Sequence, residues 1–173
     1  ICKIDKNLKV IINNKNYGHT NSPFYGILQS SGDATILISA DFQDPIELIP
    51  KLISEWEKNK KVVLLQKRSS EEGFVIKNIR KIYYRVLSKI SNQKLTIDTT
   101  GSGIYDKSVI ETFKSINEPL PYLRGLITEI ENDISTIPFD QPKRKFGKSA
   151  NNLVSLVDLA MLGFVKHSKL PLR

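Results

Sequence analysis

An acidic turn follows a short apolar run near the start of the chain. Residues 36–38 (ILI) predict a buried strand, and the turn Asp41-Phe42-Gln43-Asp44 comes directly after it. Carboxylates just past the carboxyl end of a strand lie where open α/β sheets bind their ligands. A carboxylate placed there can hold a divalent cation against a phosphate-bearing substrate. This turn is therefore the first candidate for a chemical site.

The same acids also suit a structural role. Asp44 can act as the N-cap of a following helix, with Pro45 at the first helical position and Glu47 completing a capping box. From these residues alone, capping is the favoured interpretation for Asp44. For Asp41 they do not decide between a structural role and cation binding. Because Pro50 is unsuited to a helix interior, we expect one capped turn and then a main helix with Pro50 in its first turn.

Basic residues are in excess and unevenly distributed. The net charge is +8, and the cations gather at 67–85, at 143–148 and at the extreme C-terminus. A phosphate-bearing small substrate, an anionic membrane surface or a nucleic acid would each match this charge. Nucleic acid is the least supported, because the sequence has no zinc-finger spacing, no aromatic strand of the RNA-recognition type and no recognisable helix-turn-helix.

One basic stripe lies on a predicted long helix at 74–91. Lys77, Lys81 and Arg85 recur every four residues, with Arg80 beside them. A solvated helix face explains this spacing and is favoured on the spacing alone. The alternative is an electropositive rim that binds phosphate.

Length and composition indicate one ordinary α/β domain. The chain has 173 residues, of which 40% are hydrophobic and 25% charged, as in globular proteins. Cys2 is the only cysteine, so a reducing compartment is expected and a structural zinc site is not. No apolar window is long enough to cross a membrane, and the first ten residues do not have the pattern of a signal peptide.

Strands and helices are predicted to alternate, which favours a parallel sheet with crossover connections. The strands are predicted at 9–13, 34–39, 61–66 and 134–139, and residues 98–106 are predicted as a loop that enters a strand. Besides the helix at 74–91 and the one containing Pro50, helices are predicted at about 21–30, 107–115, 122–130 and 151–165.

The last predicted helix is amphipathic. Its apolar stripe comprises Leu153, Leu156, Val157, Ala160, Met161 and Phe164, and Lys166, Lys169 and Arg173 follow. Such a stripe suits an ordinary core-facing helix. It equally suits a helix that lies in a membrane interface with its cations at the lipid headgroups. The spacing does not separate these alternatives.

Several short motifs together resemble a known family. They are Asn16-Tyr17-Gly18, the stretch 40–50 (ADFQDPIELIP), Arg124-Gly125-Leu126, the stretch 144–149 (RKFGKS) and the closing stretch 168–173 (SKLPLR). In this order, spread over essentially the whole chain, they resemble the family 2 glycosyltransferases of the polyprenyl-phosphate branch, the branch similar to dolichyl-phosphate mannosyltransferase.

The resemblance implies a GT-A fold, a Rossmann-like and mostly parallel sheet flanked by helices, with its N-terminal strands missing from this chain. Residues 1–150 would form a partial GT-A domain, and residues 151–173 the amphipathic helix, for which a place in the membrane interface stays one of the two alternatives. The implied partners are a nucleotide-sugar and a polyprenyl phosphate lipid, with Mg²⁺ or Mn²⁺ as cofactor and no nucleic acid. The implied location is cytoplasmic, at the inner face of the membrane.

The resemblance also assigns roles to individual residues. Asp41 and Gln43 would bind the metal. Catalytic roles fall to Asp41, Arg68 and Arg144, where the two arginines neutralise the departing diphosphate. The donor and its phosphates would be bound by Asn16, Gly18, Gln43 and Lys148. The acceptor phosphate would meet Lys77, Arg80 and Lys81. The implied reaction is direct displacement at the anomeric carbon by an already ionised phosphate oxygen, which needs little help from a general base.

Two departures from the family pattern support a second hypothesis, and a third indicates that the chain is an incomplete part of the domain. Ser39 stands where the pattern has the first acid of the metal motif, and Gly101 stands where many relatives have an acid near the acceptor. The family's opening strand, and the acidic turn that holds the nucleoside, have no counterpart here. The alternative function is a catalytically degenerate, glycosyltransferase-like binding or scaffold subunit.

Overall fold

A computed structural model of the chain describes residues 4–68, 99–116, 121–131 and 133–142, and also positions 157, 161 and 165. The predicted helix at 74–91, with Lys77, Arg80 and Lys81, lies outside the described residues, as do Arg144 and Lys148.

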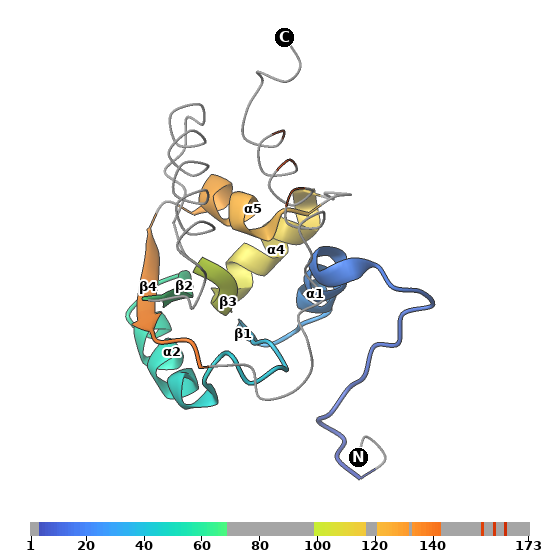
Figure 1. The fold of residues 1–173 in the computed structure, drawn as a ribbon, viewed down its shortest axis with the longest axis horizontal. Helices are drawn as coiled ribbons and strands as arrows, with labels where there is room; N and C mark the ends of the chain where they lie inside the picture. Colours follow the sequence, from blue (N-terminus) through green and yellow to red (C-terminus); the bar gives the residue numbers. More distant parts are fainter. Residues whose placement is uncertain are drawn as a thin grey trace.

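Helices and strands are interspersed along the described chain, and α4 and α5 follow one another without a strand between them (Figure 1). In order they are α1 (Gly18–Leu28), β1 (Ala34–Leu37), the 3₁₀ turn η1 (Ile46–Leu48), α2 (Ile49–Trp56), β2 (Val62–Lys67), β3 (Thr99–Asp106), α4 (Lys107–Ile116), α5 (Leu123–Ile130) and β4 (Ile134–Phe139). The predictions for β2, α4, α5 and β4 are confirmed to within one residue. The prediction of a short turn followed by a main helix is also confirmed. The turn η1 ends at Leu48, and α2 begins at Ile49 with Pro50 in its first turn.

The four strands form one mixed sheet in the order β1-β3-β2-β4. Strand β3 is antiparallel to both β1 and β2, and only β2 and β4 are parallel neighbours. The prediction of a mostly parallel sheet is therefore wrong for the described strands. Alternating helices and strands indicate crossover connections, but strand direction depends on pairing between distant segments.

One edge of this sheet collects the ends of three strands. Since β1 and β2 both run antiparallel to β3, and β4 runs with β2, the carboxyl ends of β1, β2 and β4 lie together. The amino end of β3 lies with them, because Gln66 is paired with Thr99. We call this the carboxyl edge. The acidic turn after β1 and Arg68 after β2 both start from it.

Helices cover both faces of the sheet (Figure 1). Alternate residues of β2 point to opposite faces, as the pleat requires. Val62 and Leu64 belong to a core with α1, α4 and α5, whereas Val63 and Leu65 pack in a second core that includes Leu52 of α2. All four β2 side chains are at most 2% exposed, so this strand is central to both cores.

Two predictions for strand positions are wrong. Residues 8–13 have no regular secondary structure, and Val10, Ile11 and Ile12 are all exposed. Strand propensity requires a partner strand, and none of the four described strands pairs with this segment. Residues 99–106, predicted as a loop entering a strand, form strand β3 throughout. Gly101 and Gly103 lie within it, and Gly103 permits close approach to the backbone of β2.

The last predicted helix is described at three positions only. Val157, Met161 and Val165 are helical and are 59%, 52% and 46% exposed, so these side chains are not buried in a core. Within the described residues, no helix combines the length and apolarity needed to cross a bilayer.

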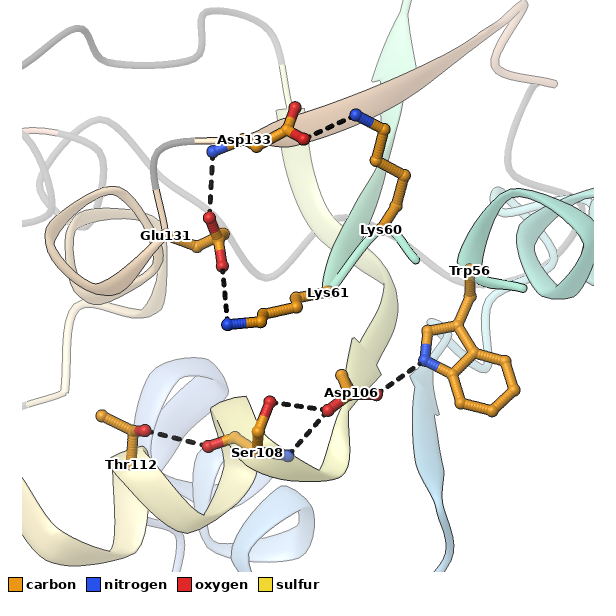
Figure 2. Close-up of polar contacts among 8 residues, drawn as sticks. All are labelled: Trp56, Lys60, Lys61, Asp106, Ser108, Thr112, Glu131 and Asp133. Atoms are coloured by element: carbon orange, nitrogen blue, oxygen red, sulfur yellow. Dashed lines mark hydrogen bonds and ion pairs between the residues drawn. The ribbon is translucent and has the colours of Figure 1, made fainter. Parts of the chain in front are cut away.

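A polar network closes the opposite edge of the sheet (Figure 2). Trp56 Nε1 donates a hydrogen bond to Asp106 Oδ2 at 2.9 Å, and the Ser108 N–H and Oγ donate to Asp106 Oδ1. Lys60 forms an ion pair with Asp133 at 2.6 Å. The network ties α2 and the start of α4 to the end of β3, away from the carboxyl edge.

Asp106 makes this network sensitive to acid. Burial alone would raise the pKa of its carboxyl, but the hydrogen bonds from Ser108 and Trp56, with the positive charge of Lys61, hold the pKa below its ordinary value of 3.8. Ionised Asp106 therefore stabilises the folded state above about pH 4, and this contribution is lost as the pH falls through the lowered pKa.

We expect the variant Asp106→Asn to be less stable than the parent at neutral pH, with a difference that shrinks below about pH 4 because the parent then loses its ionised carboxylate. Urea unfolding of both proteins at pH 7, 4 and 3 would measure the free energies of unfolding. A difference that stays constant across this range would contradict the role of Asp106 ionisation.

Candidate functional site

The turn after β1 places its first acid at the carboxyl edge. Asp41 is half-buried, and its Oδ1 accepts a hydrogen bond from the Gln43 N–H at 3.1 Å. Phe42, between them, has a φ of +60° and a side chain that is 60% exposed. A positive φ is uncommon for a bulky residue and indicates a conformation imposed by the surroundings. The turn is thus held in one shape with Asp41 at its start.

Asp44 is buried and does not cap a helix. Its side chain is 3% exposed, and its Oδ2 accepts hydrogen bonds from the Ser39 N–H at 3.0 Å and from Ser102 Oγ at 2.6 Å. The residue that precedes η1 is Pro45, and no side-chain hydrogen bond caps that turn. The predicted N-cap and its capping box with Glu47 are therefore wrong, because Asp44 bonds to donors in β3 and at the end of β1 instead.

Segments distant in sequence meet beside this turn. Gln43 Nε2 donates to the Pro142 carbonyl oxygen at 3.4 Å, which links the turn to the chain just after β4. The Arg68 N–H donates to the Phe139 carbonyl oxygen at 2.9 Å, and the Arg68 residue is exposed. The segments that follow β1, β2 and β4 therefore lie at the same edge of the sheet. In open α/β sheets, ligands bind outside the carboxyl ends of the strands, which is such an edge.

A small pocket opens at the same edge, between the start of α1, the end of β1, the start of β3 and the start of α5. Its volume is about 210 Å³, less than the ~300–1,000 Å³ typical of pockets for drug-sized ligands. The residues with polar side chains in its lining are His19, Thr20, Ser39, Ser102, Tyr122 and Arg124. The pocket therefore suits one polar group of a ligand rather than a whole nucleotide-sugar.

A larger hollow of about 630 Å³ lies elsewhere, between residues 11–17, α1 and α4. Its lining includes the polar side chains of Asn13, Asn14, Asn21, Ser22 and Lys114. Only the smaller of these two pockets adjoins the acidic turn, because Ser39 and Ser102 line it and both donate hydrogen bonds to Asp44.

Tyr105 is hydrogen-bonded to Gly101, one of the residues that line the smaller pocket. It is fully buried, and its hydroxyl donates a hydrogen bond to the Gly101 carbonyl oxygen. Burial raises the pKa of this hydroxyl far above its ordinary value, against the opposing effect of the nearby Arg124 charge. The group therefore stays protonated and acts as a donor that holds the start of β3.

Asn16 and Gly18 form the entry to α1. Asn16 Oδ1 accepts a hydrogen bond from the Gly18 N–H at 2.8 Å, and Gly18 has a φ of +81°, which favours glycine. Neither residue lines the smaller pocket, but the next one, His19, does. The two residues predicted to bind the donor, Asn16 and Gly18, therefore lie next to a pocket-lining residue in sequence but do not line the pocket themselves.

Asp41, Gln43 and Arg68 are thus placed on one edge of the sheet. The sequence did not indicate Ser102 or His19, and it predicted for Asp44 a different structural role, that of a helix cap. Arg124 was noted only as part of a family motif. Ser102 gave no sequence signal, because its hydrogen bond to Asp44 spans 58 residues.

The donor set at the turn fits a cation that is shared with a phosphate ligand. No group of three or more His, Cys, Asp or Glu side chains is found in the described part of the chain, so the side chains there do not build a complete metal cage. Magnesium is commonly held by only one or two carboxylates together with substrate phosphates. Asp41 and the amide of Gln43 match that kind of site.

The chain is similar in sequence to known glycosyltransferases. The family described as Glycosyl transferase family 2 matches residues 1–113. An uncharacterized glycosyltransferase, YkcC, of Bacillus subtilis (strain 168) is 29% identical, over 98% of this chain and 53% of its own length. The bactoprenol glucosyl transferase of Shigella phage SfX is 29% identical, over 92% of this chain and 52% of that protein.

A third relative is more distant. The undecaprenyl-phosphate 4-deoxy-4-formamido-L-arabinose transferase of Proteus mirabilis (strain HI4320) is 24% identical, over 90% of this chain and 48% of that protein. The chain spans about half the length of these curated relatives. With the family match covering most of the sequence, the chain belongs to glycosyl transferase family 2, and its relatives include members of the polyprenyl-phosphate branch.

Proposed function

We propose that this chain is part of an enzyme that moves a sugar from a nucleotide-sugar to a polyprenyl-phosphate-type lipid. The observation that supports this most is the carboxyl edge, where the turn with Asp41 and Gln43 follows β1 and Arg68 follows β2, on either side of β3 and at the edge where the smaller pocket opens. The named substrates of the bactoprenol and undecaprenyl-phosphate relatives indicate the class of acceptor.

The proposed architecture is a partial GT-A domain at 1–150 followed by an amphipathic helix at 151–173. The described mixed sheet with helices on both faces is compatible with such a domain. The exposed apolar side chains of Val157, Met161 and Val165 suit a helix that lies in the membrane interface. The proposed location is therefore the cytoplasmic face of a membrane.

In the proposed reaction, an oxygen of the acceptor phosphate attacks the anomeric carbon, the bond from that carbon to the donor diphosphate breaks, and the nucleoside diphosphate leaves. Asp41 and Gln43 would hold Mg²⁺ or Mn²⁺, which neutralises charge on the diphosphate when bound. Arg68 and Arg144 would stabilise the negative charge that develops on the leaving group.

Binding of the two substrates is assigned to further residues. Asn16, Gly18 and Lys148 would orient the donor, and Lys77, Arg80 and Lys81 would bind the acceptor phosphate. Because a phosphate oxygen is already ionised near neutral pH, no side chain is required to remove a proton from the nucleophile.

A second candidate function is a glycosyltransferase-like subunit that binds without catalysing transfer. It is favoured by Ser39, whose N–H is engaged by Asp44 and whose hydroxyl stands where the family pattern has an acid. Gly101 favours it too, because this position lies in β3 with a φ of +84°, which disfavours the acidic side chain found in many relatives.

The test is a transfer assay on the intact protein in detergent with undecaprenyl phosphate, Mn²⁺ and radiolabelled UDP- or GDP-sugars. We expect label in the lipid extract with at least one donor, and loss of that label when EDTA is added. Titration calorimetry with the same donors distinguishes the alternatives. Donor binding without transfer supports the binding subunit, and the absence of both contradicts the proposed enzyme.

A further inference from the structure

The buried carboxylate of Asp44 joins two parts of the candidate site. It lies next to Ser102 of β3, which is itself only 4% exposed, and it receives hydrogen bonds from that hydroxyl and from the Ser39 backbone. Burying a charged group is unfavourable unless hydrogen bonds compensate for its lost hydration. The two donors to Asp44 Oδ2 supply such compensation and define where the carboxylate lies.

These two bonds close the acidic turn and anchor it. The bond from the Ser39 N–H to Asp44 joins the first and last residues of the segment 39–44, so that Asp41 and Gln43 lie inside a closed loop. The bond from Ser102 then fixes this loop to the central strand β3. The hydrogen bond from the Gln43 N–H to Asp41 lies within the turn, whereas the bond from Ser102 to Asp44 connects the turn to another strand.

The same link shapes the small pocket. Ser39 and Ser102 both line it, and one oxygen atom of Asp44 accepts from both residues. A change at Asp44 would therefore move the pocket wall and the proposed cation-binding turn together. Placement errors of about 1 Å can lower enzymatic rates by ~10²-fold.

We propose that Asp44 is a positioning residue, which holds Asp41 and the pocket wall in place through Ser39 and Ser102 and does not itself bind the metal. The inference rests on the proposed function, because it assigns Asp44 to the same site. It differs from the alternative in which Asp44 is a second carboxylate ligand.

The two roles predict different orders of effect among variants. Asp44→Asn keeps an acceptor oxygen for both donors but removes the negative charge. Asp44→Ala removes both bonds, and Ser102→Ala removes one. If Asp44 positions the turn, we expect kcat/KM to fall at least about tenfold in Asp44→Ala, several-fold in Ser102→Ala and less than about threefold in Asp44→Asn. Glu47→Ala, at an exposed acid just beyond the turn, is the matched control and should leave kcat/KM unchanged.

A double variant tests the connection through Ser102. Adding Ser102→Ala to Asp44→Ala should lower kcat/KM by no more than about twofold further, because residues that act through one link are not additive. If Asp44 were a metal ligand, Asp44→Asn would lose as much activity as Asp44→Ala and would need more Mn²⁺ for half-maximal rate. Either of these results would overturn the proposal.

Hydrogen exchange gives a readout that does not depend on activity. Because the Ser39 N–H donates to a buried carboxylate, we expect its exchange rate to rise about tenfold or more in Asp44→Ala and to change little in Asp44→Asn. Unchanged exchange in Asp44→Ala would refute the positioning role. If the parent protein shows this protection but binds no nucleotide-sugar, the proposed function fails while the link itself stands.

Discussion

Replacing Gly103 with alanine is expected to destabilise the protein by about 3 kcal/mol or more. A Cβ atom at this position would lie 2.2 Å from the Val63 carbonyl oxygen and 2.9 Å from Leu64 Cα, and both are backbone atoms of the neighbouring strand. Gly103 is also paired with Leu37 on the other side, so β3 has strands on both flanks. Separating β3 from β2 would disturb both cores and the carboxyl edge. Urea unfolding followed by circular dichroism would measure the loss.

Gly26→Ala is the matched control for this experiment. Gly26 lies within α1, and a Cβ atom there would meet no atom within 4 Å. Alanine is a better helix former than glycine by about 0.5–1 kcal/mol, so this variant should be as stable as the parent or slightly more stable. Equal stability of Gly103→Ala and Gly26→Ala would contradict the close approach between β2 and β3.

Replacing Asp41 with asparagine is expected to lower kcat for sugar transfer by about 10²–10³-fold, the range found when a group that stabilises transition-state charge is removed. The amide keeps an acceptor oxygen for the Gln43 N–H, so the shape of the turn should persist. What is lost is the negative charge that would hold a divalent cation against the diphosphate. The measurement is the initial rate of transfer as a function of Mn²⁺ concentration, with the free energy of unfolding determined in parallel.

Asp33→Asn is the control for a general effect of charge. Asp33 is an exposed acid at the opposite end of β1, and it should be replaceable without a change in rate or metal dependence. Retained activity in Asp41→Asn would rule out Asp41 as the anchor of the cation. An equal loss in Asp33→Asn would show that the effect comes from net charge.

The sequence alone predicted those elements whose signals are local. Helices α4 and α5 and strands β2 and β4 follow from hydrophobic periodicity and turn residues within each segment. The sequence also indicated the acidic turn after β1, because an apolar strand followed by Asp41 is a pattern of adjacent residues. The family resemblance added the expected chemistry of this turn.

Only the tertiary structure decided the features that depend on distant partners. The direction of β3 makes the sheet mixed, and the segment 8–13 has strand-forming residues but pairs with none of the described strands. Asp44 matched a local capping pattern, yet its carboxylate bonds to Ser102, 58 residues away. A side chain's role is determined by the donors that surround it after folding, and for Asp44 one of the two donors comes from another strand.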